Sequence, residues 1–145
     1  MRRLIAGLAA IGALASPAAA PALAAAPVSQ ARLWSALGGQ VTCGVAIIGP
    51  RIPAPLLCSA RAVPPPAQGG SGDPGFVLLS TAGRARPVRL SQDSFAARHA
   101  ATLAAGASWS GVIAGVRCAV GARQVRCANR SGHGFTLTRT HYRSF

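Results

Sequence analysis

The chain has 145 residues and is strongly basic, with 15 Lys and Arg residues, 2 Asp and Glu residues and a formal net charge of +13. It contains no lysine and no glutamate, so arginine carries the charge, and Asp73 and Asp93 are its only side-chain carboxylates. Hydrolysis by paired carboxylates would need both aspartates in one cleft, which the position of Asp73 in a predicted spacer loop disfavours. The positive field instead favours polyanions as partners, such as acidic envelope polymers.

The N-terminus has the pattern of a secretory signal peptide. Arg2 and Arg3 precede an apolar run over residues 4–14, which is too short to span a bilayer. Two small-residue cleavage motifs follow, and Pro21 directly after the first favours cleavage at the second, after Ala24. An uncleaved membrane anchor is the less favoured alternative, because prolines interrupt the apolar run.

Cleavage would leave about 121 residues, the size of one small domain with a modest core. We predict a signal peptide at 1–24, a flexible leader at 25–33 and a single β-rich domain at 34–145. A Pro/Gly-rich loop is expected at 63–75, because three consecutive prolines and several glycines occur there. The signal peptide predicts a secreted or periplasmic protein, and nothing in the pattern predicts an oligomer.

Apolar residues alternate in several short runs between turn residues. They predict strands at 41–48, 56–60, 76–80 and 88–91. The alanine-rich segment 95–104 is expected to form one short helix capped by Asp93 or Ser94, although Thr102 and Leu103 fit a strand equally well.

The clearest local prediction is a β-hairpin near the C-terminus. Pairing Cys118 with Cys127 places Val120 opposite Val125 around a loop at 121–124. The apolar residues and the cysteines then share one face of the hairpin.

The opposite face of this hairpin is expected to be cationic and solvated, because Arg117 and Arg126 alternate with the cysteines. In the strand that follows, Phe135 and Leu137 are expected to point inward.

The four cysteines allow three pairings, and export favours disulfides over a metal site. Local pairing fits best, because Cys43–Cys58 and Cys118–Cys127 each bracket a hairpin-like segment. Each bridge would stabilise the fold by about 3 kcal/mol. The spacing Cys-x-x-Cys, typical of zinc sites, is absent, and no cofactor is predicted.

These features together predict an all-β fold, either a small disulfide-stapled sandwich or a partly open barrel, with at most one short helix. The segment 39–43 also resembles the segment 113–118, since each is a strand that leads into a cysteine. A likeness this short does not indicate a duplication.

The C-terminal block resembles the end of a family of small secreted bacterial domains of unknown function. Members close with Val-x-Cys-x-Asn-x-x-Gly-His-Gly-Phe-x-x-x-Arg and a terminal aromatic residue, and often begin with a Gly-x-x-x-Cys strand. The matching residues at the end are Val125, Cys127, Asn129, Gly132, His133, Gly134, Phe135, Arg139 and Phe145. At the start they are Gly39 and Cys43, and Trp109 and Cys118 also fall at family positions. The resemblance implies a secreted, disulfide-bonded β-rich domain and transfers no catalytic residue.

We interpret the chain as an exported, cationic, non-enzymatic module that binds anionic polymers of the cell envelope. Specific nucleic-acid binding is disfavoured, because aromatic residues do not alternate with the arginines. The candidate binding residues lie in the C-terminal third: Arg117, Arg126, Asn129, Arg130, His133 and Arg139.

The alternative is a small secreted hydrolase or ribonuclease-like enzyme that uses His133. Its partner would be His141, with Arg139 or Arg143 holding a phosphate. A structural role for His133 is the simpler expectation, because the glycines on both sides of it indicate a sharp turn or close packing.

Overall fold

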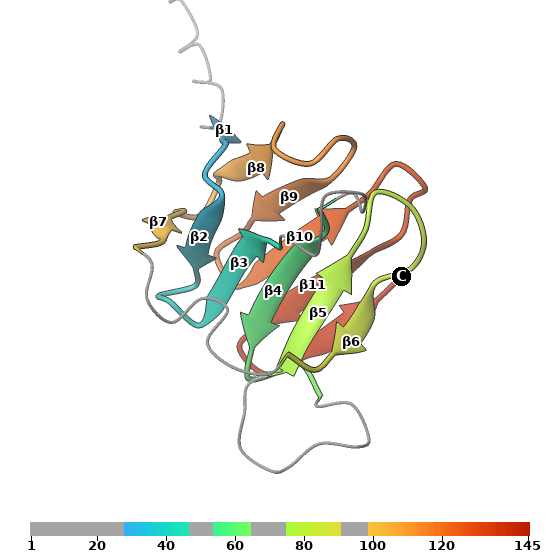
Figure 1. Cartoon of the computed structure of the whole chain (residues 1–145). Coiled ribbons are helices and arrows are strands. Elements are labelled where there is room, and N and C mark those ends of the chain that lie inside the picture. The colour runs from blue at the N-terminus through green and yellow to red at the C-terminus, as the bar shows by residue number, and fades with distance from the viewer. Residues whose placement is uncertain (1–27, 47–53, 65–74, 91–98) are drawn as a thin grey trace, which may run out of the picture.

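The computed structural model describes residues 28–46, 54–64, 75–90 and 99–145. These residues form two six-stranded sheets that stack face to face as a sandwich (Figure 1). No helix occurs among them. The predicted all-β fold and both predicted disulfides are therefore confirmed.

We call the first layer sheet A, with strand order β1-β8-β9-β10-β11-β12. Its strands are β1 (Val28–Ser29), β8 (Ser108–Ser110), β9 (Arg117–Val120), β10 (Gln124–Ala128), β11 (Gly134–Thr138) and β12 (Tyr142–Ser144). The predicted hairpin is formed by β9 and β10, and Val120 lies opposite Val125 as expected.

The second layer, sheet B, has the order β6-β5-β4-β3-β2-β7. Its strands are β2 (Leu33–Ala36), β3 (Val41–Val45), β4 (Leu56–Ala60), β5 (Gly75–Leu79), β6 (Arg86–Val88) and β7 (Ala101–Thr102). The strands expected at 56–60 and 76–80 are present within one residue. The strand expected at 88–91 is β6, which begins and ends earlier in the chain because Arg86 and Pro87 already pair with β5. As an edge strand, β6 accommodates a proline without losing an interior ladder bond.

Two segments differ from the sequence-based expectation because they pair with distant strands. The described end of the helix expected at 95–104 contains strand β7, which runs parallel to β2, so the strand alternative holds there. Residues 91–98, with both expected caps, lie outside the described residues. Likewise, the leader expected at 25–33 contains β1, which pairs in parallel with β8, and the first residue of β2.

The Pro/Gly-rich loop expected at 63–75 falls mostly outside the described residues, as does the whole predicted signal peptide at 1–24. At the edges of the loop, Val63 is a core residue with 1% of its surface exposed, and Gly75 begins β5. Gly75 must be a glycine, because a Cβ there would collide with the backbone of Val63.

The core lies between the sheets, and its centre holds both disulfides. Cys43 faces Cys58 across β3 and β4, and Cys118 faces Cys127 across β9 and β10. All four cysteines are buried. Each bridge therefore joins two neighbouring strands of one sheet and presents its sulfur atoms to the opposite sheet.

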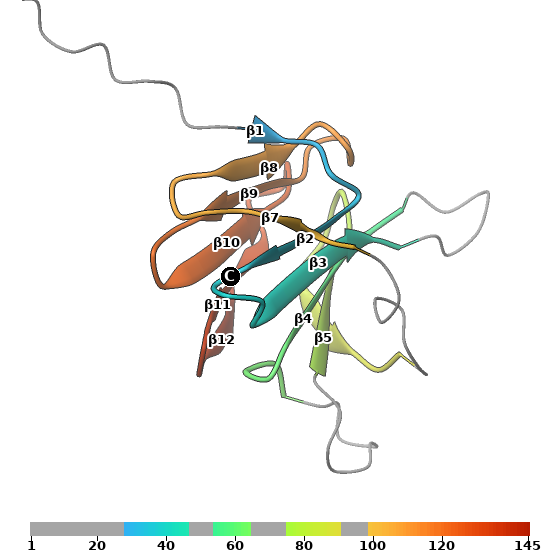
Figure 2. The same ribbon diagram turned by 90° about the vertical axis from the view of Figure 1, so that its left-hand side faces the viewer.

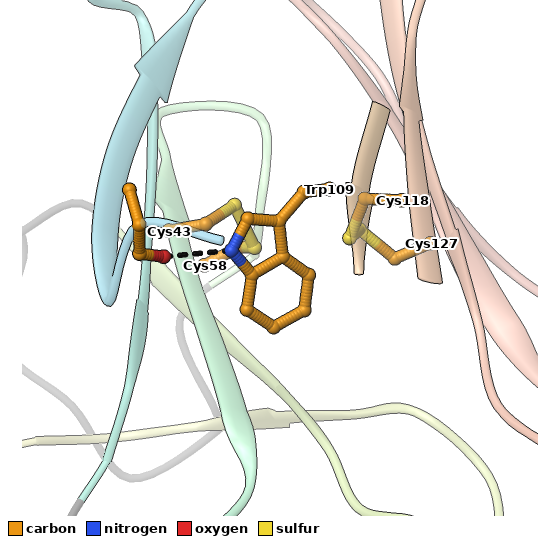
Figure 3. The surroundings of a disulfide bond; sticks show 6 residues. Cys43, Cys58, Trp109, Cys118 and Cys127 are labelled. Atoms are coloured by element: carbon orange, nitrogen blue, oxygen red, sulfur yellow. Dashed lines mark hydrogen bonds between the residues drawn. A yellow bond between two sulfur atoms is a disulfide. The ribbon is translucent and has the colours of Figure 1, made fainter. Parts of the chain in front are cut away.

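Two tryptophans fill the space beside these bridges. Trp34 lies opposite Cys43 in sheet B, and Trp109 lies opposite Cys118 in sheet A. Both are fully buried, and their ring centroids are 6.1 Å apart. Figure 3 shows the Trp109 indole reaching from sheet A toward Cys43–Cys58, with its Nε1 donating a hydrogen bond of 2.7 Å to the carbonyl oxygen of Ala31. The two sheets are thus locked by packing and by a hydrogen bond to the backbone that leads into β2.

The two sheets repeat one another. Segment 33–45 and segment 108–120 match at a constant offset, with the same residue at five positions: Trp34 and Trp109, Ser35 and Ser110, Val41 and Val116, Cys43 and Cys118, Val45 and Val120. The pairing registers match as well, because each tryptophan opposes the first cysteine of its own sheet.

The short edge strands extend the repeat, because the first strand of each half pairs with the other half. The strand that precedes β2 pairs with β8 of the other sheet, and the strand that precedes β8 pairs with β2. Figure 2 shows β1 beside β8 and β7 beside β2. The molecule is therefore built from two similar halves that swap their first strands, so the short likeness seen in the sequence is part of a longer repeat.

Replacing Trp109 with phenylalanine should destabilise the protein more than the same change at Trp34. Trp109→Phe removes the hydrogen bond to Ala31 and leaves that carbonyl unpaired. Trp34 Nε1 is buried without a partner among the described residues, so Trp34→Phe loses no such bond. We expect a difference of about 1–2 kcal/mol in the free energy of unfolding by urea titration. Equal losses would show that the Ala31 hydrogen bond does not help to lock the sheets.

Candidate functional site

The candidate residues separate onto different parts of the sandwich. Asn129, Arg130 and His133 lie in the turn between β10 and β11, at one end of the molecule. Arg139 lies beyond the other end of β11, which is five residues long. At about 3.3 Å per residue, roughly 15 Å separates these two ends.

Asn129 fastens one end of the sandwich. Its Oδ1 accepts hydrogen bonds from the backbone N–H groups of Ser131 (3.0 Å) and His133 (3.2 Å). Its Nδ2 donates to the carbonyl oxygens of Ser80 (3.0 Å) and Gly83 (2.8 Å), in the β5–β6 turn of sheet B. The side chain is buried, and its two donors and two lone pairs are all used. Asn129, a candidate binding residue, therefore has no hydrogen-bonding capacity left for a ligand.

His133 lies at the end of the same turn. The backbone around it is closely packed, as the glycines on both sides of it predict. The His133 carbonyl oxygen accepts from Asn129 N at 2.9 Å. Gly132 has a φ of 76°, and a Cβ at Gly134 would collide with the Cys127 carbonyl and approach the Phe145 ring. Both glycines are thus required by the backbone path.

The histidine pair of the enzyme hypothesis is not brought together. His133 precedes β11, whereas His141 follows the strand and its ring hydrogen-bonds to Thr140 at 2.7 Å. Arg139 also lies beyond the far end of β11 from His133, whereas Arg143 pairs with Thr136 in the middle of that strand. The geometry therefore brings neither the second histidine nor Arg139 to His133.

The outer face of sheet A is cationic. Arg117, Arg126 and Arg143 project from β9, β10 and β12 and are exposed. Arg126 and Arg143 flank Thr136 in one cross-strand row. The Arg126 guanidinium lies over the Phe145 ring, with Cζ 4.0 Å from the centroid, so a cation–π contact holds it in place. The solvated cationic face predicted for the hairpin is therefore confirmed.

Arg130 is exposed but lies against the turn between β8 and β9. A Cβ at Gly115 would collide with the Arg130 side chain, so the arginine stem covers bare backbone there. Its charged group is separated from Arg139 by the length of the sandwich.

Arg139 lies in a cleft that the sequence does not reveal. A cavity of about 540 Å³ spans the open end of the sandwich, between the β2–β3 turn, the end of β4 and the β11–β12 turn. It is lined by Gly38, Gly39, Gln40, Thr42, Ser59, Ala60, Arg61 and Arg139. Two arginines from different sheets therefore share one cavity with two side-chain hydroxyls.

A second cavity of about 620 Å³ adjoins the first at Arg139. Its lining comes from the β9–β10 loop and the β11–β12 turn: Ala122, Arg123, Thr138, Arg139 and Thr140. Arg61 and Arg123 were not predicted as site residues. The pairing of β10 with β11 brings Arg123 near Arg139, and only the stacking of the two sheets brings Arg61 there.

The charged side chains of the described residues are all of one sign, positive. They include eleven arginines, all of which are exposed. Both aspartates lie outside them, so no side-chain carboxylate offsets these arginines within the part described. Burial raises the pKa of Tyr142, and the smaller opposing effect of Ser144 does not cancel this rise, so the phenol stays neutral at physiological pH.

No family model, curated protein or solved structure matches this chain. Within the described ranges, no group of three or more His, Cys, Asp or Glu residues could hold a metal ion. Those ranges also contain no helix that is long and apolar enough to cross a membrane.

Replacing Asn129 with alanine should destabilise the protein by about 2–4 kcal/mol, because two N–H groups and two carbonyl groups lose their partner together. The control is Ser131→Ala in the same turn, where only the backbone N–H bonds to Asn129, and it should change stability by less than about 0.5 kcal/mol. Thermal or urea unfolding measures both. A stable Asn129→Ala variant would refute the fastening role.

Proposed function

We propose that the protein is an exported, non-enzymatic module that binds anionic polymers of the cell envelope through its arginines. We further propose that it acts as a monomer, in the periplasm or outside the cell, and belongs to the family of small secreted bacterial domains that it resembles. The observation that carries the proposal is the set of eleven exposed arginines with no side-chain carboxylate among the described residues.

Exposed arginines in such excess favour a partner that brings its own negative charge. A surface with mixed charges satisfies its arginines within the protein, whereas here the described part provides no acidic side chain to do so. The resulting field raises the local concentration of any polyanion and increases its association rate. It also opposes self-association, because two copies repel one another.

The distribution of the charge favours an extended partner over a small one. Exposed arginines occur on the outer face of sheet A and at the open end of the sandwich. A small anion contacts only one of these places, while a flexible polymer can contact both. Several weak contacts then add up to useful affinity.

The fold supports a location outside the cytoplasm. Two disulfides lie at the centre of the core, and such bridges form and persist in oxidising compartments. A structure held in this way keeps its arginines in fixed positions on short strands and tight turns, which limits the ordering cost of binding.

The oxidised protein should bind poly(glycerol phosphate) and heparin in a strongly salt-dependent way. If three or four anionic groups are contacted, the logarithm of the association constant should fall against the logarithm of salt concentration with a slope of about −2 to −3. Isothermal titration calorimetry over a salt series measures the slope, with uncharged dextran as the control polymer. Absence of binding at low salt would refute the proposal.

A further inference from the structure

The cleft around Arg139 has a composition suited to a particular anionic group. Arg61 and Arg139 approach the first cavity from different sheets, and the hydroxyls of Thr42 and Ser59 line it as well. A phosphate group presents its oxygens in a tetrahedral arrangement, so it accepts hydrogen bonds from donors that come from several directions. Arginine binds such oxygens with two parallel N–H bonds, each assisted by charge.

The second cavity extends this arrangement beyond a single group. Arg139 lines both cavities, and Arg123 adds a second cation on the far side. The hydroxyls of Thr138 and Thr140, which line the second cavity, bond to the backbone of Thr140 and to His141 within the β11–β12 turn and hold that turn in shape. One guanidinium has five N–H donors and can serve two neighbouring anionic groups. Two adjoining cavities that share Arg139 and hold one further arginine each fit a ligand whose negative groups repeat along a chain.

Among the residues that the structure describes, no aromatic side chain lines either cavity. Proteins that bind single-stranded nucleic acids stack the bases on aromatic rings. Phe145, which contacts Arg126, lies away from both cavities on the outer face of sheet A. The cleft therefore favours a phosphate chain without bases.

The backbone of the first cavity is unusual as well. Leu37, Gly38 and Gly39 all have positive φ values, of 55°, 69° and 82°. A leucine with positive φ is energetically costly, and such residues cluster where a binding site fixes the backbone. The equivalent β8–β9 turn in the other half lines neither cavity, and glycines alone take positive φ there.

From these features we infer that the open end of the sandwich is a binding site for a linear phosphodiester polymer without bases. Neighbouring phosphates lie in the two cavities, and Arg139 contacts both. The inference rests on the proposed function and assigns it to one site. It also explains why Arg139 lies apart from the other candidate residues.

The test compares two variants of equal net charge. Arg61→Gln/Arg139→Gln removes the cations of the first cavity, whereas Arg84→Gln/Arg86→Gln removes two exposed arginines around the β5–β6 turn, at the opposite end. With a short poly(glycerol phosphate) oligomer, the cleft variant should lose at least about tenfold in affinity and about 1–2 from its salt slope. The control should lose less than about threefold, from net charge alone.

Amide chemical shifts provide a second measurement that does not depend on a variant folding. Titration of the wild-type protein with the same oligomer should shift Gly38, Gly39 and Gln40 together with Thr138 and Thr140. Shifts confined to the outer face of sheet A would overturn the inference.

The remaining outcomes separate the inference from the proposed function. Equal losses in the two variants would overturn the site and leave general polyanion binding intact. Tighter binding of single-stranded DNA, or equal binding of polyglutamate of the same charge, would overturn the ligand class. No binding of any polyanion by the wild-type protein would overturn the inference and the proposed function together.

Discussion

The packing of Trp109 between two cross-strand disulfides holds the two layers of this small protein together. Its indole lies beside Cys118 in its own sheet and reaches toward Cys43–Cys58 in the other, while its Nε1 binds the backbone at Ala31. A disulfide within one sheet cannot fix the distance between sheets, so this contact supplies what the bridges lack. Because Trp34 packs in the corresponding place, each half of the repeat contributes one ring to the same interface.

This interface makes the two ends of the sandwich different. At one end, Asn129 ties the β10–β11 turn to the β5–β6 turn and leaves no polar group of its own for a ligand. At the other end the segment between β7 and β8 bonds to both sheets through its backbone, and no side chain of the described residues makes a bracket like that of Asn129. Arg61, Arg123 and Arg139 surround two adjoining cavities there. The hydrogen bonds of Asn129 make the sandwich rigid at one end, and this rigidity suits the cavities at the other end to binding without conformational change.

Sequence patterns predicted the features that depend on neighbours along the chain. The β9–β10 hairpin, its register and both disulfides follow from alternation and from cysteine spacing, because each involves residues at most 15 apart. The edge strand β1 escaped prediction, and β7 was foreseen only as the alternative to a helix, since each has two residues and exists only by pairing with a strand from the other half. The repeat was underestimated for a related reason: five matching positions become meaningful only when their pairing registers also agree.

The features of the candidate site also divide into those that the sequence predicts and those that depend on the tertiary structure. The amino-acid sequence by itself determined the excess of arginine over its two aspartates and the alternation that turns Arg117 and Arg126 outward. Only the tertiary structure decided that Asn129 is consumed by internal hydrogen bonds, that His133 and His141 lie apart, and that Arg61 and Arg123 meet Arg139 at one end. The physical reason is that a strand's alternation fixes which face a side chain takes. Which side chains from distant strands become neighbours depends on which strands pair, as for Arg123 and Arg139, and on how the two sheets stack, as for Arg61 and Arg139. Burial of the tryptophans and disulfides sets that stacking.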